Sequence, residues 1–277
     1  MGPPRIASAD CRGSGGFALI IVLWTLALIA FITAQLVGTG RIEIRIASNL
    51  IGSATAEAAA DGAVYQAIFG LLDPDPGRRW PLDGNVRQIA IGDCGVTVRI
   101  EDEAARINPN LAPRDLVEAL LRITGSDAAT AQRLSDAIGQ WVGMTDAPRP
   151  PDAVLSEYRA AGRNYGPPAE PLETLDELRR VVGMTPGVFA AIRPHLSLFA
   201  PAVPSLTNPD PVVAAAMAAV AGAGDTRSLL DQSDLLIARI GLIAQCRNDA
   251  RARRTVAVRV SPASGTYTTL SWQESDE

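Results

Sequence analysis

Apolar residues are concentrated in one stretch near the start of the chain, from Phe17 to about Val37, and no charged residue lies between Gly13 and Gly40. A helix rises about 1.5 Å per residue, so about twenty residues cross the ~30 Å hydrocarbon core of a bilayer. A secretory signal peptide has a shorter apolar core, of about 7–15 residues, and ends at a small-residue cleavage site. The pattern therefore predicts a transmembrane helix over residues 17–40.

The residues before this run carry two further signals. Arg5 and Arg12 favour a cytoplasmic N-terminus, which places the chain after the span outside the cytoplasm. A glycine pair, Gly15 and Gly16, directly precedes the apolar run. Because glycine leaves the backbone open to close approach, this pair is either a protease recognition point or a flexible joint before the membrane. The glycines by themselves do not decide between the two.

A helical pattern continues beyond the apolar run, from Arg41 to Leu72. The segment is rich in Ala and other helix-compatible residues, and the first proline after the run is Pro74. Its apolar positions approximate one helical stripe. These positions are Leu50, Ala54, Ala58, Ala60, Val64, Ile68 and Leu71. We expect one helix from Phe17 to about Leu72, with an apolar half in the membrane and an amphipathic half outside it.

The rest of the chain alternates between strand-like and helix-like patterns. Residues 86–101 predict two short strands broken at Gly92 and Asp93, and the segment from about Arg106 to Pro204 is helical. After a second helical patch, strands are expected again over residues 235–245, 255–260 and 267–272. Strands, then helices, then strands indicate an α+β fold in which a helical domain is inserted into an antiparallel sheet.

The predicted insertion contains a weak internal repeat. Residues 107–125 and 207–222 each place Asn-Pro before a helix that ends at glycine, and residues 172–194 repeat the helix, glycine turn and second helix. The pattern is similar to helix-hairpin-helix or SAM-like units, which in other proteins grip nucleic-acid backbone through turn amides and nearby basic residues. The turn over residues 183–187 has no adjacent basic residue. A helical packing module is therefore favoured over DNA binding.

Charge and cysteine content refine this picture. The net charge of -5 argues against nucleic acid as a partner, and 47% apolar residues are ample for a core. Of three cysteines, Cys11 lies before the apolar run, whereas Cys94 and Cys246 lie in predicted strands. The latter two either form a disulfide in an oxidising compartment or are unpaired thiols buried as small hydrophobes. Their geometry, which the sequence does not contain, decides between these alternatives.

Enzyme motifs are weak in this chain. The one histidine, His195, is flanked by apolar residues, which favours a partly buried and hydrogen-bonded side chain over a catalytic base. No G-x-S-x-G motif, Cys/His metal spacing or phosphate-binding loop occurs in the sequence. The acidic run over residues 101–103 is interpreted as a solvated strand end. We expect binding rather than catalysis.

A short basic leader, glycine before phenylalanine, an apolar helix and its amphipathic continuation together resemble the type IV pilin-like family. This resemblance implies that prepilin peptidase cuts between Gly16 and Phe17 and that the apolar helix is kept in a filament. Most members carry Glu at the fifth residue after the cut, where it meets the amine of the subunit ahead. Here that residue is Ile21. A subunit with no neighbour ahead needs no buried carboxylate, so Ile21 points to the filament tip.

Residues 136–201 and the terminal Thr-Tyr-Thr-Thr-Leu-Ser-Trp stretch narrow the resemblance to the protein K family of minor pseudopilins in bacterial type II secretion. The resemblance implies minor pseudopilins I and J as partners, with H as a further candidate, and an inner-membrane location. The expected organisation has five parts. They are a cleaved leader (1–16), a transmembrane helix (17–40), an amphipathic helix with the first strands (41–105), the helical insertion (106–204) and the returning body with the C-terminal strands (205–277).

The same family resemblance implies a calcium site, because its members show several acidic residues after a tryptophan. Calcium takes about 6–8 oxygen ligands, several of them carboxylates. The candidate ligands here are Asp146, Asp152 and Glu157, but Gly143 and Val154 stand where acids are expected. Such a site binds calcium weakly or not at all. The alternative is an irregular loop held by prolines and by the packing of Trp141, and no other cofactor is expected.

Overall fold

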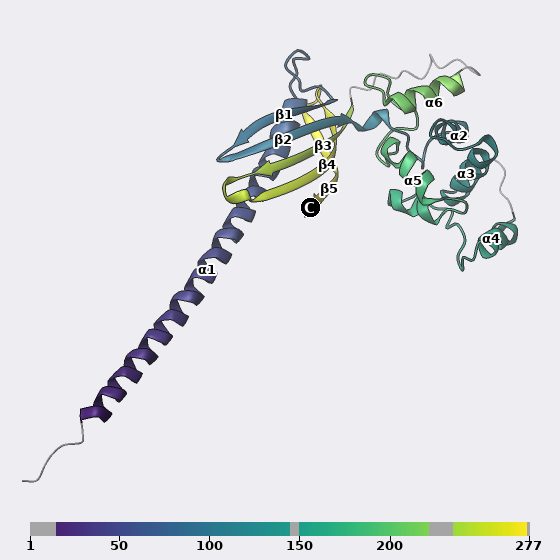
Figure 1. Ribbon diagram of the computed structural model, residues 1–277. Coiled ribbons are helices and arrows are strands. Elements are labelled where there is room, and N and C mark those ends of the chain that lie inside the picture. The colour runs from purple at the N-terminus through teal and green to yellow at the C-terminus, as the bar shows by residue number, and fades with distance from the viewer. Residues whose placement is uncertain (1–14, 145–149, 222–234, 276–277) are drawn as a thin grey trace, which may run out of the picture. The chain divides into compact units, whose positions relative to one another are not determined.

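The computed structural model describes residues 15–144, 150–221 and 235–275 (Figure 1). By its internal packing the chain divides into two units, Met1–Thr55 and Ala56–Glu277. Residues of the helix α1 belong to both units.

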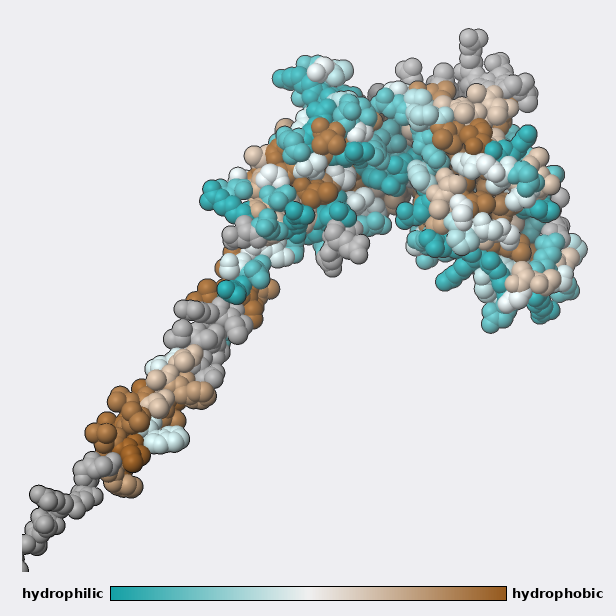
Figure 2. Space-filling view, in the orientation of Figure 1, coloured by the Kyte–Doolittle hydropathy of each residue, from teal (hydrophilic) through white to brown (hydrophobic). Residues whose placement is uncertain are grey.

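The first element, α1, is a single helix from Gly15 to Leu71, as the continuous helical pattern predicted. Within the first unit, its segment Phe17–Ala34 has a mean hydropathy of 2.7 and none of it is buried. Figure 2 shows the hydrophobic side chains along this part of the helix. By length and composition α1 can cross a membrane, which is consistent with a membrane anchor or a signal segment.

The second unit contains a sheet whose five strands follow one another in chain order, each antiparallel to the next. The strands are β1 (Asp83–Ile91), β2 (Cys94–Asp102), β3 (Leu236–Gln245), β4 (Arg251–Ser261) and β5 (Thr266–Ser275). All five were predicted, but β4 begins four residues earlier than expected. Its first half alternates Arg251 and Arg253 with buried Ala252 and Arg254, so the usual alternation of apolar and polar residues is hidden there.

One face of the sheet packs on the C-terminal half of α1, and small residues make this packing close. The helix contributes five buried alanines together with Val64, Ile68 and Leu71. The alanines are Ala56, Ala59, Ala60, Ala63 and Ala67. Opposite them lie buried aliphatic side chains of β2, β3 and β4. Because alanine projects little, backbone and sheet approach closely, and burial of the strand side chains removes apolar area from water.

A set of short helices is inserted between β2 and β3, as predicted. The elements are η1 (Glu103–Ala105), α2 (Arg114–Ile123), α3 (Ala128–Trp141), α4 (Pro151–Ala160), η2 (Leu175–Arg180), α5 (Pro186–Ile192), η3 (Arg193–His195) and α6 (Pro211–Ala221). A further short turn of helix, η5 (Arg247–Asp249), joins β3 to β4.

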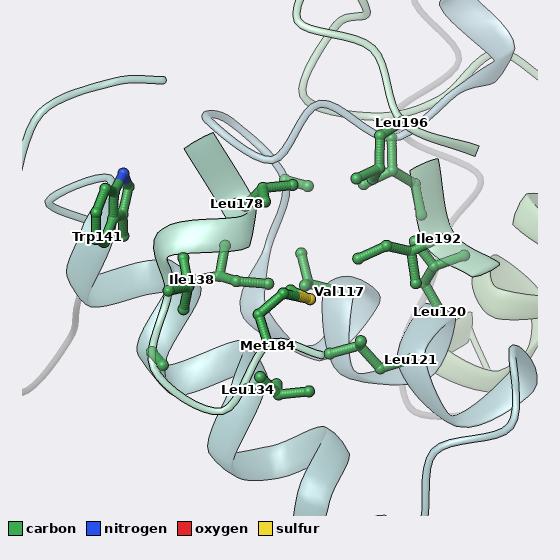
Figure 3. Packing of buried hydrophobic residues seen from close by; sticks show 14 of the residues in the cluster. Val117, Leu120, Leu121, Leu134, Ile138, Trp141, Leu178, Met184, Ile192 and Leu196 are labelled. Carbon is green, nitrogen blue, oxygen red and sulfur yellow. The ribbon is translucent and has the colours of Figure 1, made fainter. Parts of the chain in front are cut away.

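These helices share a second hydrophobic core, separate from the core beneath the sheet. Figure 3 shows Val117, Leu121 and Leu134 pointing toward one another from α2 and α3. The core extends further than the boundary predicted at Pro204, because α6 adds Val213, Ala216 and Met217 to it. The sequence boundary was drawn where prolines interrupt the helical pattern, whereas apolar packing joins α6 to the preceding helices.

The turn between α2 and α3 shows how glycine ends these helices. Gly125 has a φ of +106°, and its N–H donates to the carbonyl of Arg122 at 3.1 Å. The N–H of Ser126 donates to Leu121 at 2.9 Å, which completes a Schellman motif. Asp127 then caps α3 by accepting a hydrogen bond from the N–H of Thr130 at 3.0 Å. The predicted glycine-ended helix at this position is confirmed.

The Asn-Pro-Asn stretch before α2 fastens distant loops of the insertion. Asn108 is 2% exposed, and its side-chain amide donates to the carbonyls of Leu198 at 3.0 Å and Ala200 at 2.7 Å. Asn110 exchanges two hydrogen bonds with the backbone of Leu172, at 3.0 and 2.8 Å. A buried amide stabilises a fold only when its hydrogen bonds are made, and here they hold the loops that frame the helical core.

Candidate functional site

The predicted cleavage point lies at the start of α1. Gly16 and Phe17 fall in the first turn of the helix, which begins at Gly15, and Phe17 is 72% exposed. Residues 1–14, which hold the basic leader, lie outside the described residues. Cleavage between Gly16 and Phe17 therefore stays a prediction.

Ile21 lies one turn further along the same helix. Its side chain is 48% exposed, and its apolar neighbours are exposed over the whole of the apolar span. An aliphatic residue at this position adds to an uninterrupted apolar surface, whereas a carboxylate would need a partner in a membrane. The structure of the single chain does not test the interpretation of Ile21 as a tip residue, which stays a prediction.

Cys94 and Cys246 form a disulfide, which is the first of the two alternatives left open by the sequence. Cys94 begins β2 and Cys246 directly follows β3, so the bond links the two ends of adjacent strands. It closes a loop across a sequence separation of 152 residues, which includes the whole helical insertion. A cross-link over so long a loop restricts the unfolded chain strongly, and such bonds persist in oxidising compartments.

The described residues do not assemble the predicted calcium site. Asp152 and Glu157 lie five residues apart on α4, so their side chains point roughly 140° apart around the helix axis. Asp146 lies outside the described residues. No group of three or more His, Cys, Asp or Glu side chains suited to a metal occurs among the described residues. Calcium binding therefore stays a prediction.

Trp141 instead holds the surroundings of the predicted calcium loop by packing. Its ring centroid lies 6.3 Å from those of Tyr158 and Tyr165, and its side chain is 3% exposed. The carbonyl oxygen of Ala169 lies 2.7 Å from where a Cβ of Gly143 would be, so the backbone segments touch. The indole Nε1 has no acceptor among the described residues. These contacts pack the described residues on both sides of residues 145–149, and the loop itself lies outside the described residues.

His195 is hydrogen-bonded and partly buried, as the sequence predicted. Its Nδ1 lies 2.7 Å from Oδ2 of Asp210. The other oxygen of Asp210 accepts the N–H of Val212 at 2.9 Å and so caps α6. The pair therefore ties the end of η3 to the start of α6, and its geometry accounts for the histidine without a catalytic role.

The acidic run at the end of β2 differs from the solvated strand end that the sequence predicted. Glu103 is completely buried, and its carboxylate pairs with Arg239 of β3 at 2.6 Å and with Arg106 at 3.6 Å. Arg106 also donates to Glu101 at 2.6 Å. Burial raises the pKa of the neighbouring Asp102, which caps η1 through the N–H of Ala104. Charged residues are buried here because opposite charges from distant strands meet at the start of the insertion.

Sequence reasoning also missed a buried arginine beneath the sheet. Arg254 is 5% exposed and donates to Asp61 of α1 at 2.9 Å, with Glu274 of β5 at 3.4 Å. The only available signal was the odd position of Arg254 among inward-facing residues of β4, between Ala252 and Val256. This ion pair joins helix and sheet, so it belongs to the fold rather than to a site.

This chain is similar to known proteins both in sequence and in structure. Residues 85–201, which include β2 and most of the insertion, match the sequence profile of the family described as Type II secretion system (T2SS), protein K. The chain is 26% identical over 220 residues to the type II secretion system protein K of Aeromonas hydrophila, covering 68% of this chain and 64% of that protein. For the protein K of Pectobacterium carotovorum subsp. carotovorum the identity is 23% over 206 residues, with coverages of 65% and 62%. The chain thus spans less than two thirds of the length of both relatives.

A solved structure has the same fold. It is the crystal structure of the GspK-GspI-GspJ complex from the type 2 secretion system of enterotoxigenic Escherichia coli, with a TM-score of 0.56 and 16% sequence identity. The match covers 86% of this chain and 99% of the matched chain. This chain thus combines an apolar N-terminal helix, an antiparallel sheet and a helical insertion. It also has distant sequence similarity to protein K of two bacteria. This chain is thus a distant homologue of type II secretion system protein K over most of its length, and it shares the fold of a chain in the solved GspK-GspI-GspJ complex.

Proposed function

We propose that this chain is a minor pseudopilin at the tip of a type II secretion pseudopilus, where it helps to initiate assembly and supports protein export across the outer membrane. The observation that carries the proposal is α1. Its apolar segment, exposed over its whole length, continues without interruption into the helix that packs on the sheet. One helix of this kind serves as a membrane anchor before assembly and as a bundle-forming element afterwards.

The proposed location is the inner membrane, crossed once, with the sheet and the insertion in the periplasm. Arg5 and Arg12 before the span favour a cytoplasmic N-terminus. The disulfide between Cys94 and Cys246 fits an oxidising compartment for the body of the protein. Prepilin peptidase would remove residues 1–16 and leave Phe17 as the new N-terminus.

The test is the intact mass and N-terminal sequence of the protein from membranes, with and without prepilin peptidase. We expect a chain that begins at Phe17 only when the peptidase is present. Replacing Gly16 with a bulky residue should block the cut, whereas the same replacement at Gly13 should not. A chain that keeps Cys11 and Arg12 in both strains would make the helix an ordinary anchor and would contradict the proposal.

The proposed tip position rests on Ile21 and on the helical insertion. Ile21 keeps the apolar surface continuous where shaft subunits would carry a carboxylate, and the insertion is large enough to hinder addition of a further subunit. Removing the complete helical core, from Arg106 to Ala221, should therefore change pseudopilus number or length. Pseudopili of normal number and length from that variant would contradict the capping role while leaving the membrane anchor intact.

The proposed partners are minor pseudopilins I and J, with H as a further candidate. Support comes from the solved GspK-GspI-GspJ complex, one chain of which has the same fold as this chain. Co-purification of the full chain with I and J from detergent-solubilised membranes tests this assignment. If neither I nor J co-purifies with the chain, the assignment is contradicted.

The alternative, a membrane-anchored protein that binds DNA through its helical turns, has less support. Arg179 precedes the turn at Gly183 but is occupied: it pairs with Asp176 at 3.1 Å and its guanidinium lies 4.4 Å from the ring centroid of Phe189. Salt-sensitive binding of duplex DNA by the full chain would favour the alternative. Salt-independent association with other pseudopilins would favour the pseudopilin assignment.

A further inference from the structure

Arginine is concentrated in β3, β4 and the turn between them. Residues 236–261 contain six of the 25 basic residues of the chain and one acidic residue, Asp249, although the net charge of the whole chain is -5. Two of the six have partners inside the fold. Arg239 pairs with Glu103, and Arg254 pairs with Asp61. The other four require a separate account.

Three of the remaining arginines lie on one face of one strand. Along β4 the even-numbered residues from Ala252 to Val260 are buried, as is Ala257, whereas Arg251, Arg253 and Arg259 are exposed. Since side chains alternate across a strand, these three point away from α1, on the outer face of the sheet. None of the three forms an ion pair with a described residue. Arg247, in the turn, makes only a long contact of 3.8 Å with Asp93.

The strand register leaves these three arginines beside neutral residues. Opposite charges placed across neighbouring strands stabilise a sheet, so an unpaired array brings no such gain. The residues that lie opposite the three arginines on β3 and β5 are Gln245, Ile243, Ser275, Ile237 and Thr268. Charged residues often protect an edge strand from pairing with another chain, but β4 lies between β3 and β5. Edge protection therefore does not explain the arginines.

Apolar side chains lie between these cations. Ile243, opposite Arg253, is 40% exposed, and Ile237, opposite Arg259, is partly exposed. A Cβ built at Gly241 meets no atom within 4 Å, so the face is open between these isoleucines. Figure 2 shows hydrophobic patches within a largely hydrophilic surface on the body that contains the sheet. Arginine is enriched at protein–protein interfaces, and the exposed isoleucines opposite two of these arginines distinguish this face from a purely ionic one.

We propose that this outer face, defined by Arg251, Arg253, Arg259, Ile237 and Ile243 and called here the arginine face, docks an acidic segment of another protein. The guanidinium group presents a planar fork that matches a carboxylate with two parallel hydrogen bonds. Three such groups on alternate positions of one strand, spaced by multiples of ~6.6 Å, match carboxylates along an extended or helical segment. The isoleucines favour a protein over a nucleic acid or a lipid headgroup, which offer no apolar side chain to them.

The test uses the full chain in detergent micelles and a fluorescent decaglutamate peptide, with decaglutamine as the neutral control. The variant carries Arg251→Gln, Arg253→Gln and Arg259→Gln together. A matched control carries Arg122→Gln, Arg159→Gln and Arg193→Gln, which are exposed on the helical insertion and change the net charge equally. We expect the first variant to bind decaglutamate about tenfold more weakly, ~1.4 kcal/mol, and the control within about twofold of the unmodified chain.

Two further measurements keep the outcome clear. Replacing the same three arginines with lysine preserves charge and should retain part of the affinity, and it remains informative if the glutamine variant does not fold. Equal losses in both glutamine variants would reduce the effect to net charge and overturn the proposal, as would unchanged binding in the first variant. Tighter binding of duplex DNA or of phosphatidylglycerol vesicles through the same arginines would assign the face to a different class of partner and would also overturn it.

Discussion

The two hydrophobic cores of this protein are built from different side chains. Beneath the sheet, a long helix supplies alanines and the strands supply Val, Ile and Leu. In the insertion, short helices supply large side chains, including Leu121, Leu134 and Phe189. The long helix and the strands make their own backbone hydrogen bonds over most of their length. Small side chains on the helix then let it lie close to the sheet. Short helices leave many helix ends and loops, which are held by larger apolar residues and by buried amides such as that of Asn108.

This comparison teaches where each region is vulnerable. The insertion depends on single large side chains, each of which fills much space among short elements. The sheet depends on close approach to α1, on its strand ladders and on the bond between Cys94 and Cys246. Substitutions that create cavities should therefore damage the insertion, whereas substitutions that add volume or remove the bond should damage the sheet.

The largest effect is expected from Leu178→Ala in the helical core. Leu178 is completely buried, so its truncation should destabilise the insertion by about 2–5 kcal/mol through lost burial and the cavity left behind. Hydrogen exchange read by mass spectrometry should show faster exchange over α2 to α6 and unchanged exchange in the sheet. Leu206→Ala, at a side chain 47% exposed, is the matched control. Equal acceleration in both cores would show that they unfold as one.

Loss of the disulfide should destabilise the sheet more than the helical insertion. Replacing Cys94 and Cys246 with alanine together should cost about 2–4 kcal/mol, because the unfolded chain gains freedom over a long loop. Thermal melting followed by exchange of the strand amides provides the measurement, with Cys11→Ala as the control. A variant that melts like the unmodified chain would contradict the role given to this bond.

A larger side chain beneath the sheet should cause the third-largest loss of stability. Ala63 is completely buried between α1 and the strands, so Ala63→Leu should destabilise the sheet by about 1–3 kcal/mol through overpacking. Ala58→Leu, on the exposed side of the same helix, provides the control with the same propensity change. Chemical denaturation of the two variants gives the comparison. Equal stabilities would mean that the helix and sheet are not closely packed at Ala63.

The smallest effect concerns a helix end in the insertion. Hydrogen bonds from the Thr130 side chain and N–H hold the pKa of Asp127 below its ordinary value of 3.8. Because the folded pKa is lowered, the cap stabilises α3 above pH 3.8 and loses this contribution as the pH falls through the folded pKa. Asp127→Ala should therefore lower the melting temperature slightly near neutral pH and not in acid. Asp127→Asn keeps a capping oxygen but no charge, so near neutral pH it should lose less stability than Asp127→Ala, and that loss should not depend on pH through this group.

Much of the fold could be predicted because its signals are local. The uncharged apolar run and the absence of proline between that run and Pro74 predicted α1, and Gly125 predicted the end of α2. Alternating residues predicted the strands, although the arginines of β4 hid its first half. For the candidate site, the hydrogen-bonded state of His195 was predicted, whereas calcium binding by Asp146, Asp152 and Glu157 stays a prediction, because Asp146 lies outside the described residues.

By itself, the sequence determined the long helix, the five strands, the inserted helices and the glycine turns, since each depends on residues a few positions apart. Only the tertiary structure decided which distant residues meet. It paired Cys94 with Cys246, buried Glu103 against Arg239, joined α6 to the helical core and left the arginine face without acidic neighbours. The physical reason is that burial and ion pairing depend on distances between elements, which strand register and packing set and local periodicity does not contain.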